Sequence, residues 1–277
     1  MTATASRRGA GLTVSNPELQ ELLPGVRSAY GDLLLALADS ELVLGHRHSE
    51  WTGFAPSAEE DVAFSSIAQD EMGHAHLYYA LITGAADESA VDSLALDRSP
   101  RQMRHLPLLH APNGDWFFTI ARHVYWDTWE QVLLNAALSA TLPLLPSAAE
   151  RILNEEVYHQ EHAVQWLELL SSRPPQQQRL VAALTRVVAI GGSPSRRLSG
   201  LAELAGAGRL PAPSDLEKSF AGSLRLQLTG AGGWRHDDAD VALRGLGGEG
   251  PWPTPPGLGQ LHTDLTAMRR AHPGATW

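Results

Sequence analysis

The sequence contains no cysteine, which excludes disulfide bonds, thiolate metal ligands, a cysteine nucleophile and a cysteine-bound iron–sulfur cluster. Lysine is nearly absent as well, because Lys218 is the single lysine among 21 basic residues. Arginine would therefore have to bind any anionic group. The chain also lacks a signal-peptide core and any apolar run approaching the roughly 18 residues of a membrane-spanning helix. These absences predict a soluble, cytoplasmic protein that does not enter a membrane.

The net charge and the length of the chain restrict the class of protein further. The formal net charge of −10 argues against a nucleic-acid partner, because such a partner requires a basic surface. A chain of 277 residues with 43% hydrophobic content can bury one large core. Helix-forming stretches dominate its first two-thirds, so the composition favours an all-α protein.

Two copies of one motif are the main functional signal. Asp70 precedes Glu71 and His74 in a Glu-x-x-His pattern, and an acid again precedes Glu-x-x-His at residues 155–159. On a helix, residues three apart lie on one face, about 5 to 6 Å apart at Cβ, so a glutamate and a histidine can bind one metal ion. Two such helices facing each other are typical of a dinuclear metal site. The predicted ligands from these motifs are Glu71, His74, Glu156 and His159.

A dinuclear carboxylate site also needs one acid from each of two further helices. Glu41 lies 30 residues before Glu71 (71 − 41), and Asp127 lies 29 before Glu156 (156 − 127). Similar offsets are what two antiparallel helix pairs of similar length would give. Glu130 lies one turn after Asp127 on nearly the same face, and it remains the alternative ligand. The offset symmetry favours Asp127.

The surroundings of these acids support metal binding. Most neighbours of Glu41, Glu71 and Glu156 at helical spacing are apolar. Because an isolated buried carboxylate is prohibitively costly, each acid must be neutralised, paired or bound to metal. Asp70 and Glu155 turn about 100° away from the ligand face. They are either acceptors for the other N–H of the opposite motif's histidine or simply solvated acids.

The helical pattern and the positions of proline and glycine divide the chain into three parts. Residues 1–15 form a polar tail, residues 16–192 a bundle that carries the metal site, and residues 193–277 a Gly/Pro-rich extension packed on it. Ser57 is a predicted N-cap, with Glu60 three residues later. Short amphipathic segments are expected at 215–228 and 258–272, and Gly-rich stretches at 230–233 and 245–250 separate them. The bundle helices are predicted at 17–48, 58–84, 115–141, 147–171 and, as a fifth helix, 174–191.

Several segments resemble one known family. The segments 37–51, 59–63, 112–116 and 260–277 are similar to the PaaC subunit of the phenylacetyl-CoA ring 1,2-epoxidase. The resemblance covers nearly the whole chain and implies a ferritin-like four-helix bundle with a C-terminal helical extension. In that complex PaaC is usually the non-catalytic partner, whereas PaaA carries the di-iron site and epoxidises the ring of a CoA thioester.

The metal motifs depart from that family. Typical PaaC sequences have lost most of the ligands, but all six predicted ligands are present here, and their motifs resemble those of PaaA, which also uses an aspartate on the third ligand helix. The resemblance therefore implies a PaaC-like body with a PaaA-like site. It adds weight to Asp127 and implies two iron ions (Fe²⁺/Fe³⁺), with O₂ as co-substrate. The sequence alone does not separate iron from manganese.

Three functions are compatible with these features. The first is a di-iron monooxygenase that hydroxylates or epoxidises an aromatic or acyl-thioester substrate, or oxygenates nitrogen. The second is a non-catalytic PaaC-type scaffold, and the third is a ferritin-like metal-binding protein. The first requires an external reductase, because the chain has no electron-transfer motif of its own. The expected partners are a small-molecule substrate, with a CoA or carrier thioester included, and either a second copy of the chain or a PaaA-like chain.

Overall fold

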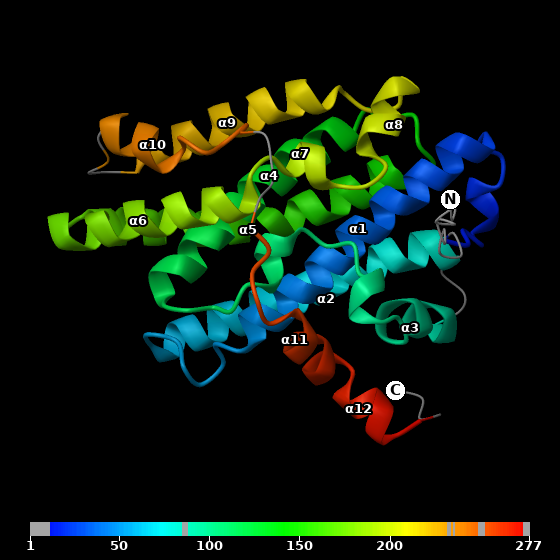
Figure 1. Cartoon of the computed structure of the whole chain (residues 1–277), viewed down its shortest axis with the longest axis horizontal. Helices are drawn as coiled ribbons and strands as arrows, with labels where there is room; N and C mark the ends of the chain where they lie inside the picture. Colours follow the sequence, from blue (N-terminus) through cyan, green and yellow to red (C-terminus); the bar gives the residue numbers. More distant parts are fainter. Residues whose placement is uncertain (1–11, 85–87, 232–233, 235, 249–252, 274–277) are drawn as a thin grey trace, which may run out of the picture.

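The computed structural model describes residues 12–84, 88–231, 234, 236–248 and 253–273. Within these ranges every regular element is an α-helix or a short 3₁₀ helix, and no strand occurs. The prediction of an all-α, ferritin-like fold is therefore confirmed (Figure 1). None of the helices in these ranges is long and apolar enough to cross a bilayer.

Two long helix pairs form the centre of the molecule. Helix α1 (Pro24–Ser49) packs along α2 (Ala58–Thr83), and α4 (Trp116–Ala137) packs along α5 (Leu145–Ser171). Gly45 allows the first pair to approach closely, because a Cβ at this position would lie 3.1 Å from both the Ala68 carbonyl oxygen and Glu71 Cβ. Glu41 and Glu71 are consequently held on adjoining turns of two tightly packed helices.

Most predicted helix boundaries lie close to the observed ones. The prediction for α6 (Pro174–Gly191) is confirmed, and α2 starts after Ser57, whose Oγ accepts a hydrogen bond from the Glu60 amide at 3.4 Å. The predicted start of the first helix at Pro17 is wrong. Pro17–Leu19 is only a 3₁₀ turn, η1, and α1 begins at Pro24, because proline fits the first turn of a helix but interrupts its interior.

The connection between α2 and α4 contains structure that the sequence analysis did not predict. It includes α3 (Glu88–Leu96) and the 3₁₀ turns η2 (Pro100–Gln102) and η3 (Pro107–His110). The buried Asp39 anchors this connection to α1. Its carboxylate pairs with Arg98 and accepts hydrogen bonds from the Tyr79 hydroxyl at 2.6 Å and the Arg104 amide at 2.7 Å.

The chain after α6 packs back on the bundle. Its first elements are α7 (Pro194–Arg197), α8 (Leu201–Gly206), α9 (Pro213–Gly230) and α10 (His236–Ala242). Helix α9 contacts α4 of the second helix pair, whereas α10 contacts α6 and α9 (Figure 1). The amphipathic segment expected at 215–228 lies within α9.

The amphipathic segment expected at 258–272 is not one helix. It divides at Thr266 into α11 (Leu258–Leu265) and α12 (Ala267–Ala271). Residues 1–11 of the polar tail, residues 232–233 and 249–250 of the Gly-rich stretches, and the terminal residues 274–277 lie outside the described residues.

Candidate metal centre

Every predicted metal ligand lies on one of the four long helices, and its side chain is buried. Helix α1 supplies Glu41, α2 supplies Glu71 and His74, α4 supplies Asp127 and Glu130, and α5 supplies Glu156 and His159. None of these residues is more than 2% exposed. Five carboxylates in a dry interior need protons or cations, because bare charge is very costly there.

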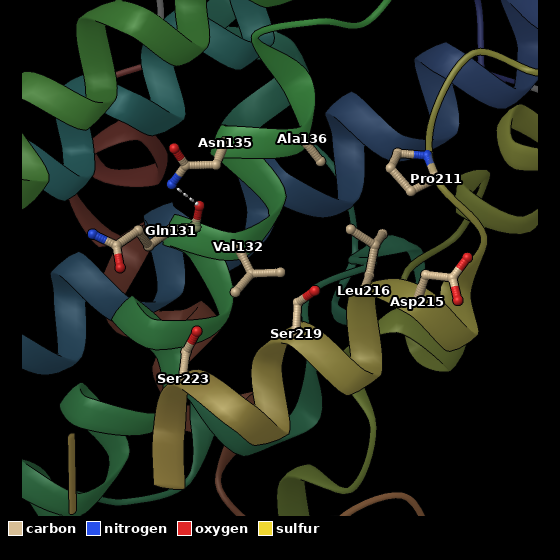
Figure 2. Close-up of a pocket in the computed structure, with 9 residues that line it drawn as sticks. All are labelled: Gln131, Val132, Asn135, Ala136, Pro211, Asp215, Leu216, Ser219 and Ser223. Atoms are coloured by element: carbon tan, nitrogen blue, oxygen red, sulfur yellow. Dashed lines mark hydrogen bonds between the residues drawn. The ribbon is translucent and has the colours of Figure 1, made fainter. Parts of the chain in front are cut away.

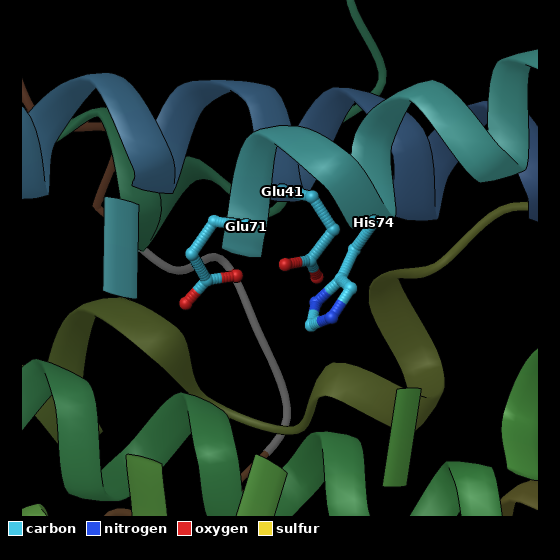
Figure 3. A group of neighbouring side chains, drawn as sticks. All are labelled: Glu41, Glu71 and His74. Carbon is cyan, nitrogen blue, oxygen red and sulfur yellow. The ribbon is translucent and has the colours of Figure 1, made fainter. Parts of the chain in front are cut away.

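The first helix pair forms one potential metal-binding group. Glu41, Glu71 and His74 each offer a ligand atom, and these atoms lie within 4.8 Å of one another. Figure 3 shows the three side chains directed toward a common space from α1 and α2. One carboxylate from α1 and one Glu-x-x-His pair from α2 thus form the first half of the candidate centre.

The second group links the two helix pairs. Ligand atoms of Glu71, Glu130 and Glu156 lie within 4.8 Å of one another, so Glu71 belongs to both groups. His159 Nδ1 lies 3.0 Å from Glu156 Oε1 and 3.9 Å from Glu71 Oε1, which places His159 at the edge of this group. Glu71 is therefore positioned as a carboxylate that could bridge two ions.

Asp127 belongs to neither group, although the offset symmetry of the sequence favoured it. Its Oδ2 atom lies 3.1 Å from Nδ1 of His123, one turn earlier on α4. The sequence analysis did not identify His123. The i, i+4 spacing of His123 and Asp127 is the only local signal that could have indicated the contact. Because the Asp127 carboxylate is directed toward His123, the geometry favours Glu130 as the α4 carboxylate of the centre.

The acids that precede the two motifs form crossed contacts. Glu155 of α5 lies beside His74 of α2, with 2.7 Å between Oε2 and Nε2. Asp70 of α2 lies beside His159 of α5, with 3.3 Å between Oδ2 and Nε2. Each histidine thus contacts an acid from the opposite motif through Nε2, which leaves Nδ1 facing the centre. A carboxylate in this position fixes the orientation of a metal-binding histidine.

The electrostatics of the centre show a deficit of positive charge. Burial raises the pKa of Glu41, Glu71 and Glu130 well above the ordinary value of 4.5. The charges of neighbouring carboxylates raise it further, although the interaction of Glu71 with Glu41 lowers the pKa of Glu71 in part. Burial lowers the pKa of His159, but Glu156 and Asp70 outweigh it and raise the pKa to about 11. Several of these carboxylate oxygens have no hydrogen-bond partner. A buried set of oxygen and imidazole donors in this state fits divalent first-row metal ions such as iron.

Other side chains near the centre have mixed roles. Trp126 Nε1 donates a hydrogen bond to Glu41 Oε1 at 3.2 Å, and the buried His48 lies 3.8 Å from Glu71 Oε1 through Nδ1. His162 contacts Glu60, with 2.7 Å between Nε2 and Oε2. Trp126 and His48 thus belong to the immediate surroundings of the ligands.

The fold and this site together define a class. The chain is an all-α protein of ferritin-like fold with buried Glu/His groups that could hold metal at the centre of its bundle. Its sequence matches the family described as "Phenylacetic acid catabolic protein", which groups PaaA and PaaC, over residues 18–277. The chain belongs to this family. The resemblance to PaaC-type proteins is thereby confirmed.

One curated relative supports the same assignment. The chain is 35% identical over 138 residues to a protein from Escherichia coli (strain K12) that is named as the C subunit of 1,2-phenylacetyl-CoA epoxidase. The aligned region covers 50% of this chain and 56% of that relative. The chain thus matches little more than half the length of the relative.

Proposed function

We propose that the chain is the oxygen-activating subunit of a di-iron monooxygenase. The observation that supports this proposal most strongly is the position of Glu71 in both buried ligand groups. Glu41, Glu71 and His74 would hold one iron ion, and Glu130, Glu156 and His159 the other, with Glu71 shared between them. When bound, the iron pair supplies the activation of O₂ and the oxidation of the substrate.

The protein residues would prepare this chemistry in three ways. Burial of the ligands excludes bulk water from the centre. The contacts of Asp70 with His159 and of Glu155 with His74 fix the two imidazole rings. The Trp126 indole N–H holds one oxygen of Glu41 and leaves the other available to a metal ion.

Two hollows along α4, the helix that carries Glu130, are candidates for substrate binding. One, of about 430 Å³, lies between α4 and α9 and is lined by residues that include Gln131, Asn135 and Ser219 (Figure 2). The other, of about 500 Å³, lies between α4 and α5 and also includes Gln131, together with Gln160 and Val157. The Gln160 Nε2 atom is buried without a hydrogen-bond partner, so it is free to donate to a ligand. Each hollow combines polar and apolar side chains with one acid, Asp215 or Glu161, and neither is lined by a basic residue, so both suit an uncharged, amide-bearing chain better than an anionic group.

The relative's name indicates a substrate class to test first. Since that protein is named as part of a phenylacetyl-CoA epoxidase, we propose an aromatic acyl thioester as the substrate. Electrons would come from a separate reductase, because this cysteine-free chain cannot ligate an iron–sulfur cluster through thiolates.

Oxygenation can be measured directly. Iron-loaded protein supplied with a chemical reductant, an aryl acyl thioester and isotopically labelled O₂ should give a product that contains one labelled oxygen atom. The Glu71→Gln variant is the negative control. Iron oxidation without label in any product would contradict the monooxygenase proposal and favour metal storage.

The α4 ligand can be identified by paired substitutions. Glu130→Gln should lower iron content and weaken iron affinity by on the order of 100-fold, because it removes a carboxylate from the Glu71–Glu156 group. Asp127→Asn should have a smaller effect, about 10-fold, because its carboxylate contacts His123. Metal analysis of both variants after anaerobic reconstitution tests this order. The reverse order would restore Asp127 as the ligand that the offset symmetry indicated.

A scaffold role is the second candidate, and the identity to the E. coli PaaC-type protein favours it. In this case the chain would support catalysis only with a PaaA-like chain and would form a heterodimer with it. The labelling assay separates the two functions: product formation by the chain alone supports the oxygenase, and product only after addition of a PaaA-like chain supports the scaffold. Self-association into a homodimer remains a prediction for the first case.

A further inference from the structure

Tyr78 differs from the other buried tyrosines of the described chain. Its side chain is 1% exposed, and its hydroxyl has no hydrogen-bond partner. A buried hydroxyl without a partner is destabilising and uncommon in native proteins. The other three buried tyrosines each donate from the hydroxyl: Tyr30 to the Pro143 carbonyl at 2.8 Å, Tyr79 to Asp39 at 2.6 Å and Tyr125 to the Gly192 carbonyl at 2.8 Å.

The position of Tyr78 relates this unpartnered hydroxyl to the metal centre. Tyr78 lies on α2 one turn after His74 and two turns after Glu71, on the face that carries both candidate ligands. Ligand atoms of Glu71, Glu130 and Glu156 lie within 4.8 Å of one another, so the α2 face that carries Tyr78 is directed toward carboxylates of α4 and α5. Tyr78 therefore adjoins both helix pairs of the centre.

Glu130 lacks hydrogen-bond donors, just as the Tyr78 hydroxyl lacks an acceptor. Both of its carboxylate oxygens are buried and lack a hydrogen-bond partner. Burial, followed by Glu130 as the strongest neighbouring charge, raises the pKa of Tyr78 well above its ordinary value of 10.0. The phenol is thus a neutral donor at physiological pH. One buried region contains a donor without an acceptor and an acceptor without a donor.

We infer that the Tyr78 hydroxyl is the hydrogen-bond donor that orients the Glu130 carboxylate in the metal-loaded centre. The bond is not formed in the structure, and the binding of metal would form it by fixing the Glu130 carboxylate beside the phenol. Carboxylates that ligate metals are themselves commonly hydrogen-bonded, and loss of such a partner typically weakens metal binding 10- to 100-fold. The inference rests on the proposed metal centre and gives Tyr78 a positioning role in it.

Tyr78→Phe tests the inference, and Tyr30→Phe is the matched control. Titration of the metal-free proteins with Co²⁺, followed by its visible absorption, should show about 10-fold weaker binding and an altered spectrum for Tyr78→Phe. Tyr30→Phe should match the wild type in both respects. In the absence of metal, the two substitutions should change the thermal stability of the protein in different directions. Tyr30→Phe should lower the thermal midpoint, because it deletes the bond to Pro143, whereas Tyr78→Phe should leave it unchanged or raise it.

A double variant identifies the acceptor. If Tyr78 acts through Glu130, adding Tyr78→Phe to Glu130→Gln should weaken Co²⁺ binding no further than Glu130→Gln alone. Additive losses, or wild-type Co²⁺ affinity in Tyr78→Phe, would overturn the inference while leaving the metal centre intact. Failure of the wild-type protein to bind Co²⁺ at all would overturn both this inference and the proposed function.

Discussion

Replacing Glu71 by glutamine should strongly weaken the binding of both metal ions, the largest functional effect expected of a single substitution in this chain. Glu71 is the one residue that belongs to both ligand groups of the described structure. Glutamine keeps the size of the side chain but removes the charge and the second carboxylate oxygen. Iron affinity should fall by on the order of 100-fold or more, measured by metal analysis and by titration of the metal-free protein.

The fold should survive this change. Burial raises the pKa of Glu71, so without metal the carboxyl group is held in its neutral form, which glutamine imitates. The metal-free variant should therefore unfold at the wild-type temperature or above it. Glu168→Gln is the control, because Glu168 is an exposed acid on α5. A Glu71→Gln protein that still binds a full complement of iron would rule out the shared ligand.

The largest expected effect on stability is at Gly200. This residue has φ of +81°, and a Cβ there would lie 2.0 Å from the Ala29 carbonyl oxygen of α1. Gly200→Ala must therefore move backbone as well as adopt an unfavourable left-handed conformation. We expect a loss of about 3 kcal/mol or more in the free energy of unfolding, measured by urea denaturation.

Gly222→Ala provides the matched comparison. Gly222 lies inside α9, and nothing lies within 4 Å of the Cβ that alanine would add. Because alanine is favoured over glycine in helix interiors, this variant should gain about 1 kcal/mol. Equal effects of the two substitutions would show that Gly200 is not packed against the Ala29 carbonyl of α1.

The sequence predicted the long helices and the buried acids because both depend on local patterns. The apolar stripes of α1, α2 and α5 have helical spacing, and an acid on such a stripe has to be buried when the stripe packs. The N-cap at Ser57 could be predicted in the same way, because it depends only on Ser57 and on Glu60 three residues later. The start of α1 was misplaced because Pro17 and Pro24 are both compatible with a first helical turn.

The contacts between helices could not be predicted in the same way. Asp127 and Glu130 share a face of α4, so only the packing against α1, α2 and α5 decides which carboxylate turns toward Glu71. Likewise, the surroundings of His123 could not be predicted from local sequence, because they include side chains distant in sequence such as His48, whose ring centroid lies 5.4 Å away. The unpartnered hydroxyl of Tyr78 is a property of the assembled core alone.

The crossed acid–histidine contacts couple the positions of the two Glu-x-x-His motifs, because each motif contacts the histidine of the other. Asp70 is next to Glu71 in α2 but contacts His159, and Glu155 is next to Glu156 in α5 but contacts His74. Any rotation of α2 that shifts Glu71 would also disturb the orientation of the histidine on α5, and the converse holds for α5. A protein that lost one of the two motifs would therefore also lose the acid that contacts the histidine of the other motif.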